Sequence, residues 1–239
     1  MSGPQCCENP PTLDSSCGGG SVTEVGGLKA YVTGPSDSKR AIVLVSDIYG
    51  YEAPNLRALA DKVAAAEFYV VVPDFLYGDP YVPENTDRPI QVWLKSHMPD
   101  KGAEDAKLII AALRSKGMSA IGAAGFCWGA KVVVELGKSN YIQSAVLLHP
   151  SFVTVDDFKE VMAPIAVLGA EMDHLSPPEL LKQFEKVLFS RPEINGYVKI
   201  FPGVAHGWTV RYKVEDENAM KSAEEAHKNM LDWFTEYVK

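Results

Sequence analysis

The stretch Ile121–Val134, IGAAGFCWGAKVVV, decides the fold of this chain. Its apolar start, its glycines and its apolar end predict a buried strand, a tight turn and the first turns of a helix. The turn Gly125-Phe126-Cys127-Trp128-Gly129 fits the pattern G-x-S-x-G, with cysteine in place of serine. Such a turn holds its nucleophile in a strained backbone conformation. Small residues are needed two positions either side, because larger ones would collide with the neighbouring strand and helix.

The helix that follows this turn directs its N-terminal N–H groups and the positive end of its dipole at the Cys127 sulfur. That arrangement favours the thiolate, which is the reactive form of cysteine. The alternative is that Cys127 is only a small apolar side chain in an Ala/Gly-rich packing turn, since cysteine is often buried. A base, an acid and an oxyanion hole elsewhere in the chain would favour a nucleophilic Cys127 over a cysteine that only packs.

The composition is that of a globular protein, with 46% apolar and 23% charged residues in a chain of 239. This length suits one α/β domain. A net charge of −8, without a lysine- or arginine-rich run, argues against nucleic acid or an anionic membrane as a partner. No segment approaches the roughly 18 consecutive apolar residues of a membrane span. The first residues, MSGPQCCENPP, also lack the pattern of a signal peptide.

Three of the four cysteines, Cys6, Cys7 and Cys17, lie near the N-terminus. This is no disulfide framework, and it predicts a cytoplasmic protein. We expect these thiols to be exposed on a flexible arm over residues 1–20, which is rich in Pro, Gly and Ser. Metal binding by these cysteines is the alternative, but their spacing matches no zinc pattern. We therefore expect neither a metal nor a cofactor.

Strands and helices alternate from residue 41 to the end of the chain. This order predicts an α/β fold with a mostly parallel, doubly wound sheet and helices on both faces, in one domain over 21–239. Residues 75–99 hold several prolines and aromatics with little periodicity, which is typical of a lid or binding loop. Asp100 is the expected N-cap of the next helix. The expected strands are 28–33, 41–45, 69–72, 119–124, 145–148, 164–168 and 196–201, and the expected helices are 53–66, 100–116, 128–138, 177–189 and 218–238.

Two further residues come after strands that lie later in the chain than the strand before Cys127. Functional residues of open α/β sheets lie in such loops, at the carboxyl ends of strands. The two residues are Asp173 and His206, and the order nucleophile, acid, histidine is that of the α/β-hydrolases. In these roles His206 takes the thiol proton or pairs with the thiolate, and Asp173 orients His206. Taken singly, Asp173 could be a turn or cap residue and His206 a surface histidine. Three suitable residue types at the right strand ends, in the right order, favour the triad.

The loop after the strand 41–45 supplies one oxyanion N–H in this fold, and the residue after the nucleophile supplies the other. By position these are the backbone N–H groups of Ile48 and Trp128. His174 lies too early in the chain for the catalytic histidine. His149 also follows a strand, and it is either part of the pocket or a structural histidine.

With these residues in hand, the chain resembles the dienelactone hydrolase family of carboxymethylenebutenolidase-like proteins. It is most similar to plant members labelled endo-1,3;1,4-β-D-glucanase-like. The similarity lies in residues 125–129 (GFCWG), 169–173 (GAEMD) and 203–207 (GVAHG). The resemblance implies an α/β-hydrolase fold and a Cys-Asp-His triad that cleaves a small ester or lactone through an acyl-thioester. We expect a monomer or weak homodimer.

The chain departs from the bacterial members in the pocket. Their loop after the early strand carries a glutamate that pairs with the resting thiol, and here Asp47 stands at that position. They also bind the substrate carboxylate with two arginines, of which one has no counterpart here and the other is matched by Arg211 with its spacing off by one. The residues expected to bind substrate are Asp47, Tyr49, Tyr77, Trp93, His149, Trp208 and Arg211.

Three other functions compete with ester hydrolysis. A glucanase needs two facing carboxyl groups, and Asp173 is already assigned to the histidine, so this activity is not expected. A ligand-binding or receptor protein could be built on a hydrolase scaffold. In a redox-sensing protein, Cys127 would become oxidised to a sulfenic acid, and this reaction would need neither Asp173 nor His206.

Overall fold

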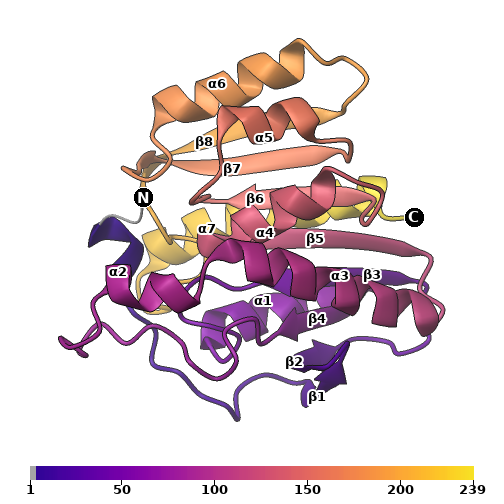
Figure 1. The fold of residues 1–239 in the computed structure, drawn as a ribbon, viewed down its shortest axis with the longest axis horizontal. Helices are drawn as coiled ribbons and strands as arrows, with labels where there is room; N and C mark the ends of the chain where they lie inside the picture. The colour runs from indigo at the N-terminus through magenta and orange to yellow at the C-terminus, as the bar shows by residue number, and fades with distance from the viewer. Residues whose placement is uncertain (1–3) are drawn as a thin grey trace.

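The strands form one eight-stranded sheet in the computed structural model, which describes residues 4–239 (Figure 1). Their order is β1-β2-β4-β3-β5-β6-β7-β8, with only the first two strands antiparallel to their neighbours. The predicted mostly parallel α/β sheet is therefore confirmed. The strands are β1 (Ser21–Val25), β2 (Leu28–Thr33), β3 (Arg40–Val45), β4 (Tyr69–Pro73), β5 (Ala120–Phe126), β6 (Ser144–Leu148), β7 (Ile165–Met172) and β8 (Gly196–Ala205).

Helices cover both faces of this sheet, and each face has its own apolar core. The inner strands are apolar throughout because both of their faces are buried, as the run AIVLV of β3 shows. Helices α1 (Pro54–Ala64) and α7 (Glu217–Tyr237) pack on one face. Helices α3 (Pro99–Ser115), α4 (Trp128–Gly137), α5 (Val155–Glu160) and α6 (Pro178–Phe189) pack on the other, which faces the viewer in Figure 1.

The last two strands run further than the sequence predicts. β7 continues to Met172 and β8 to Ala205, so Asp173 and His206 come directly after them. The sequence Pro202-Gly203 suggested an earlier end, but β8 is an edge strand, where a proline is tolerated because its missing N–H can face solvent. Met172 pairs with Ala205 after a shift in register between Ala170 and Met172. The two residues that follow are thereby brought side by side.

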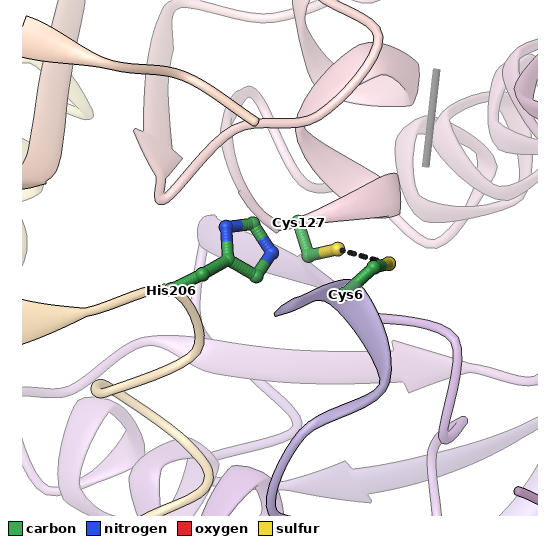
Figure 2. A group of neighbouring side chains, drawn as sticks. All are labelled: Cys6, Cys127 and His206. Atoms are coloured by element: carbon green, nitrogen blue, oxygen red, sulfur yellow. Dashed lines mark hydrogen bonds between the residues drawn. The ribbon is translucent and has the colours of Figure 1, made fainter. Parts of the chain in front are cut away.

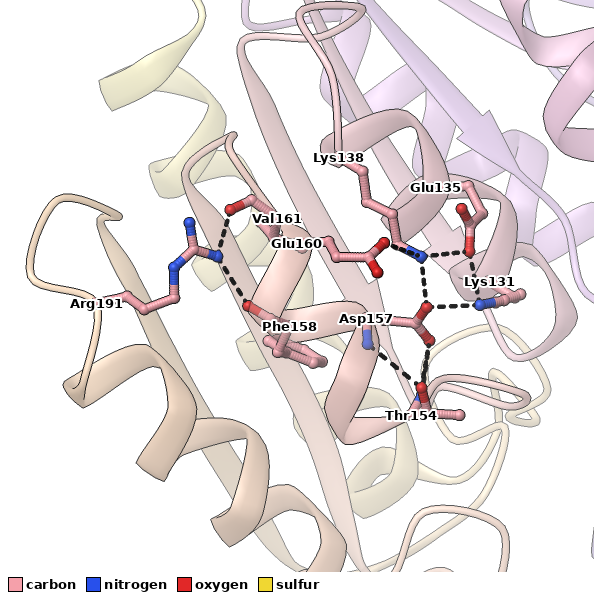
Figure 3. A network of polar contacts seen from close by, with 9 residues as sticks. All are labelled: Lys131, Glu135, Lys138, Thr154, Asp157, Phe158, Glu160, Val161 and Arg191. Atoms are coloured by element: carbon pink, nitrogen blue, oxygen red, sulfur yellow. Dashed lines mark hydrogen bonds and ion pairs between the residues drawn. The ribbon is translucent and has the colours of Figure 1, made fainter.

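Strand β1 and helix α5 were not predicted from the sequence. The strand β1 pairs with β2 and forms the edge of the sheet. The short helix α5 begins at a capping box, in which Thr154 and Asp157 bond each other's backbone N–H groups. The Asp157 carboxylate also binds Lys131 of α4 and Lys138 at its C-terminal end, and this network fixes α5 to α4 (Figure 3).

The expected N-cap of α3 is wrong. Met98 holds that position without a side-chain hydrogen bond, and Pro99 begins the helix, so Asp100 lies inside the first turn. Proline suits a first helical position because its missing N–H would have no partner there. An acidic residue in the first turn still complements the helix dipole.

The segment 75–99 contains two short turns of helix, α2 (Ile90–Trp93) and η2 (Leu94–Ser96). The buried Trp93 ring stacks on His97 at 4.1 Å and meets the edge of Tyr81 at 6.0 Å. Tyr81 and Trp93 belong to the apolar core on the face of the sheet that α3 and α4 cover, so the segment is packed onto the domain. Whether it moves as a lid stays a prediction. Among residues 4–239, no helix has the length and apolar character needed to cross a membrane.

Candidate active site

Cys127 lies in the turn between β5 and α4, with φ of 52° and ψ of −110°. A positive φ is unusual for a residue with a side chain, and it marks the strained turn that the sequence predicts. Both neighbouring glycines are needed by close packing. A Cβ on Gly125 would strike the Gly129 backbone, and a Cβ on Gly129 would strike the Val45 carbonyl of β3.

The Cys127 sulfur is fully buried within a cluster of polar atoms. The Cys6 sulfur lies 3.5 Å away and the Ser151 hydroxyl 3.4 Å away. One ring nitrogen of His206 lies within 4.8 Å of both sulfurs, and Figure 2 shows the ring on the opposite side of Cys127 from Cys6. Residues from the start, the middle and the end of the chain thus meet at one sulfur.

Asp173 holds the other side of the His206 ring, where Nδ1 lies 2.8 Å from Asp173 Oδ2. Both side chains are buried. The second carboxylate oxygen accepts hydrogen bonds from the Leu175 and Ser176 N–H groups, at 2.8 and 3.2 Å. The bond at Nδ1 leaves Nε2 as the nitrogen available to Cys127 or substrate, and Nε2 has no hydrogen-bond partner among the described residues. The structure therefore brings the three predicted residues together.

The electrostatics of this cluster favour a charged pair of Cys127 and His206. Burial by itself raises the pKa of the Cys127 thiol, but the hydrogen bond from Cys6 and the charge of His206 outweigh it. The pKa of Cys127 therefore lies well below the ordinary cysteine value. Burial lowers the pKa of His206, yet the Cys127 thiolate and the Asp173 carboxylate raise it to about 9. The thiolate and the imidazolium stabilise each other.

The two predicted oxyanion donors lie on neighbouring elements. Trp128 is the first residue of α4, whose N–H lacks an intrahelical partner, and Ile48 follows β3. Val45 at the end of β3 pairs in register with Gly125 of β5. The loop of Ile48 therefore follows β3 beside the turn that carries Cys127. The role of these two N–H groups stays a prediction.

The N-terminal arm, residues 4–20, closes the site from outside. Gln5 bonds the Met172 carbonyl and the His174 N–H, at 2.6 and 2.7 Å. A cavity of about 370 Å³ borders His206 and reaches Asn9 of the arm, but Cys127 is not among its lining residues. The cavity therefore reaches His206 but not the buried sulfur, against which Cys6 of the arm lies. The first short helix of the arm, η1 (Pro4–Cys7), lies at the sheet end that carries the predicted residues.

The model of the dienelactone hydrolase family matches residues 28–238 of this chain. The chain belongs to the dienelactone hydrolase family. Membership supports a hydrolase of carboxylic esters or lactones as the activity class of this chain.

Relatives in this family have varied names. A Zea mays protein named endo-1,3;1,4-beta-D-glucanase is 46% identical over 80% of this chain, which spans 63% of the maize protein's length. The carboxymethylenebutenolidase homolog of Xenopus tropicalis is 32% identical, with 92% of this chain and 91% of that protein covered. The hydrolase pyvD of Aspergillus violaceofuscus is 30% identical over 98% of this chain and 97% of its own length.

Solved structures share the fold. A putative dienelactone hydrolase from Klebsiella pneumoniae aligns with a TM-score of 0.73 at 21% identity, covering 88% of this chain and 93% of that one. The protein TT1662 from Thermus thermophilus aligns with a TM-score of 0.69 at 14% identity, covering 91% and 96%. The predicted α/β-hydrolase fold of this dienelactone hydrolase family member is therefore confirmed.

In this family member Asp47 does not pair with the thiol, as the glutamate of the bacterial members does. The Asp47 carboxylate binds Arg211, with Nε to Oδ2 at 2.7 Å, and both side chains are buried. Its other oxygen accepts the Tyr49 N–H at 2.9 Å. Among the described residues, the hydrogen-bonding neighbours of the thiol are Cys6 and Ser151 rather than this carboxylate.

The remaining predicted substrate residues fall into two groups. His149 lies between His206 and Trp208, with its ring centroid 5.1 Å from that of His206 and 5.3 Å from that of Trp208. Tyr77 and Trp93 belong to the segment 75–99. The half-exposed Tyr77 borders a separate cavity of about 360 Å³, and the Trp93 indole donates to the Asp79 carbonyl at 3.0 Å. Contact of any of these residues with substrate stays a prediction.

The sequence analysis missed Cys6 and Ser151. We expected the N-terminal thiols to be exposed, and for Cys6 this is wrong because its side chain is fully buried against Cys127. Cys7 and Cys17 are partly buried. Only the pair Cys6-Cys7 in an otherwise polar arm could have drawn attention to this position. Of the described residues, Cys6, Cys127 and His206 form the group whose ligand atoms are close enough to hold a metal ion.

Proposed function

We propose that this chain hydrolyses a small carboxylic ester or lactone through an acyl-thioester on Cys127. The observation that carries the proposal is the buried cluster in which Asp173 holds His206 and His206 faces the Cys127 sulfur on a strained turn. A nucleophile, a base and the group that orients the base are the three parts of covalent acyl transfer.

In this mechanism the Cys127 thiolate attacks the carbonyl carbon of the substrate. The N–H groups of Ile48 and Trp128 stabilise the oxyanion, a contribution of about 3 kcal/mol for each donor. His206 gives its proton to the leaving alkoxide, which departs as the alcohol. His206 then takes a proton from water, the resulting hydroxide cleaves the thioester, and the carboxylic acid leaves Cys127 as a thiolate again.

The charges around the pocket favour a neutral substrate. Arg211 is the cation that could bind a substrate carboxylate, but the buried Asp47 carboxylate already compensates it at 2.7 Å. The pair of Cys127 and His206 is likewise neutral as a whole. A carboxylate placed beside these groups would lose its hydration without meeting an unpaired positive charge. We therefore expect p-nitrophenyl acetate to be a better substrate than the hemisuccinate ester of p-nitrophenol.

The glucanase name of the maize relative does not transfer to this site. Glycoside hydrolysis needs two carboxyl groups facing each other across the bond. Here Asp173 is bound to His206, Asp47 to Arg211, and Glu171 accepts the Gly203 N–H at 2.7 Å. We expect no release of reducing sugar from mixed-linkage glucan by the pure protein. Release that disappears in Cys127→Ala would overturn this expectation.

The decisive experiment measures hydrolysis of p-nitrophenyl esters and small lactones by the wild type and by Cys127→Ala. We expect the variant to lose at least about 10³-fold in kcat/KM, as nucleophile deletions do. Cys17→Ala is the matched control, because Cys17 lies outside the cluster. Mass spectrometry of the wild type mixed with a slow ester tests for the acyl-thioester. Equal rates for both variants would refute the proposal, and retained ligand affinity without turnover in the wild type would favour a binding protein.

A further inference from the structure

The buried contact between Cys6 and Cys127 joins residues 121 positions apart, with the two sulfurs 3.5 Å from each other. Both side chains have no exposed surface. The two thiols differ in character. The sulfurs lie within hydrogen-bond distance, and the pKa of Cys6 is well above the ordinary value because of this contact and its burial. A thiol whose pKa is raised therefore lies against one whose pKa is lowered.

The arm that carries Cys6 is bound to three other parts of the chain. Arg211 Nη1 donates to the Cys6 carbonyl at 2.7 Å, and the Tyr49 hydroxyl donates to the Cys7 carbonyl at 2.8 Å. Gln5 is bound to the residues on both sides of Asp173. These contacts hold Cys6 in one place against Cys127.

We propose that Cys6 and Cys127 form a reversible disulfide when a peroxide reaches the site, and that this bond fixes the arm over the nucleophile and stops turnover. A disulfide bond is about 2.05 Å long. The two sulfurs must therefore approach by about 1.5 Å, which rotation of the Cys6 side chain and a small shift of the single-turn helix η1 can supply.

The chemistry needs only the two thiols and the peroxide. The Cys127 thiolate attacks the peroxide, breaks its O–O bond and becomes a sulfenic acid, while the other oxygen leaves as an alkoxide or hydroxide and takes the proton of the His206 imidazolium to become an alcohol or water. The Cys6 sulfur then attacks the sulfenic sulfur, the S–S bond forms, and the expelled hydroxide takes the Cys6 proton as water. Two thiols have lost two electrons and two protons, which the peroxide has accepted. A dithiol reverses this through a mixed disulfide and restores both thiols.

The bond has two consequences. It blocks the sulfur that the proposed function uses, so the enzyme is inactive while the bond lasts. It also protects Cys127 from further oxidation. A sulfenic acid without a neighbouring thiol is oxidised further to a sulfinic acid, which dithiols do not reduce. The loss of turnover rests on the proposed function, but formation of the bond depends only on the two sulfurs.

The test treats the wild type with hydrogen peroxide, blocks free thiols and maps disulfides by mass spectrometry of a digest. We expect a cross-linked pair of peptides that contains Cys6 and Cys127 and is two hydrogens lighter than the separate peptides. Turnover of p-nitrophenyl acetate is followed in parallel and is expected to stop with peroxide and to return with dithiothreitol. If the cross-link forms in a protein without esterase activity, the proposed function fails and the disulfide proposal stands.

Cys6→Ser and the adjacent Cys7→Ser are the matched variants. Peroxide should inactivate Cys6→Ser without recovery in dithiothreitol and with sulfinic acid at Cys127, whereas Cys7→Ser should recover like the wild type. Two results would overturn the proposal: no Cys6–Cys127 peptide in wild type that peroxide has inactivated, or full recovery of Cys6→Ser. Should Cys6→Ser fail to fold, the peptide map of the wild type still decides.

Discussion

Arg211 and Asp47 form a buried ion pair beside the nucleophile, with Nε donating to Oδ2 at 2.7 Å and both side chains almost without exposed surface. Arg211 also reaches the arm, where Nη1 donates to the Cys6 carbonyl. One guanidinium therefore connects the loop after β3, the loop after β8 and the segment that covers Cys127. Removing it should affect stability first, because a carboxylate would be left unpaired in the interior.

Arg211→Met is expected to lower the free energy of unfolding by about 3–5 kcal/mol, the usual cost of leaving one buried charge without its partner. Urea unfolding at neutral pH measures this change. The double variant Asp47→Asn/Arg211→Met should recover part of the loss. Lys228→Met breaks the exposed Lys228–Asp232 pair and should change the stability by less than about 1 kcal/mol. An equal cost for the two single variants would contradict the argument.

The pH profile of ester hydrolysis should reflect the charged pair of Cys127 and His206. The pKa of Cys127 is lowered well below the ordinary cysteine value, so its acidic limb lies at lower pH than that of an ordinary thiol, and the pKa of His206 is raised to about 9. We expect kcat/KM to be flat through neutral pH and to fall above about pH 9, where His206 loses the proton that the leaving group needs. A profile that instead rises between pH 8 and 9, as for an ordinary thiol, would be inconsistent with the pair.

Asp173→Asn removes a charge that raises the pKa of His206 and disturbs the tautomer of its ring. The alkaline limb of the profile should therefore move to lower pH, and kcat should fall by about 10³- to 10⁴-fold. Stopped-flow or steady-state rates across the pH range test both effects in one experiment. A variant with a lower kcat but an unmoved alkaline limb would show that Asp173 acts only through packing.

Tyr49→Phe should loosen the arm without altering the cluster around Cys127. The variant loses the hydrogen bond from the Tyr49 hydroxyl to the Cys7 carbonyl, which is worth about 1 kcal/mol. The open population of the arm should then rise about fivefold, and the rate of Cys127 alkylation by iodoacetamide should rise with it. Tyr69→Phe on β4 is the control, since Tyr69 makes no hydrogen bond to residues 4–20. Equal alkylation rates in both variants would mean that the arm does not limit access.

Asp157→Asn should weaken the network that fixes α5 to α4 (Figure 3). Burial raises the pKa of Asp157, but Lys131 and Lys138 outweigh it and lower this pKa to about 2. Because the folded value lies below the unfolded one, the stabilisation is present above about pH 4 and is lost as the pH falls through 2. We expect a loss of about 2 kcal/mol at pH 7 that shrinks toward pH 2. The control Asp156→Asn, whose side chain is 80% exposed, should change little at any pH.

The sequence by itself determined the alternation of strands and helices, because apolar runs and turn residues act over a few neighbouring positions. It also determined the turn around Cys127, because Gly125 and Gly129 stand where a larger side chain would collide with nearby backbone atoms. Asp173 and His206 could be found because parallel strands bring their carboxyl ends to the same edge of a sheet.

Only the tertiary structure decided what surrounds the nucleophile. The contact of Cys6 with Cys127 joins the first described turn to the middle of the chain, and the Asp47–Arg211 pair spans 164 positions. No periodicity or spacing specifies such partners, since they depend on which loops and which part of the arm the folded sheet brings together. The same holds for the lengths of β7 and β8, where pairing between the strands overrode the local turn signal of Pro202-Gly203.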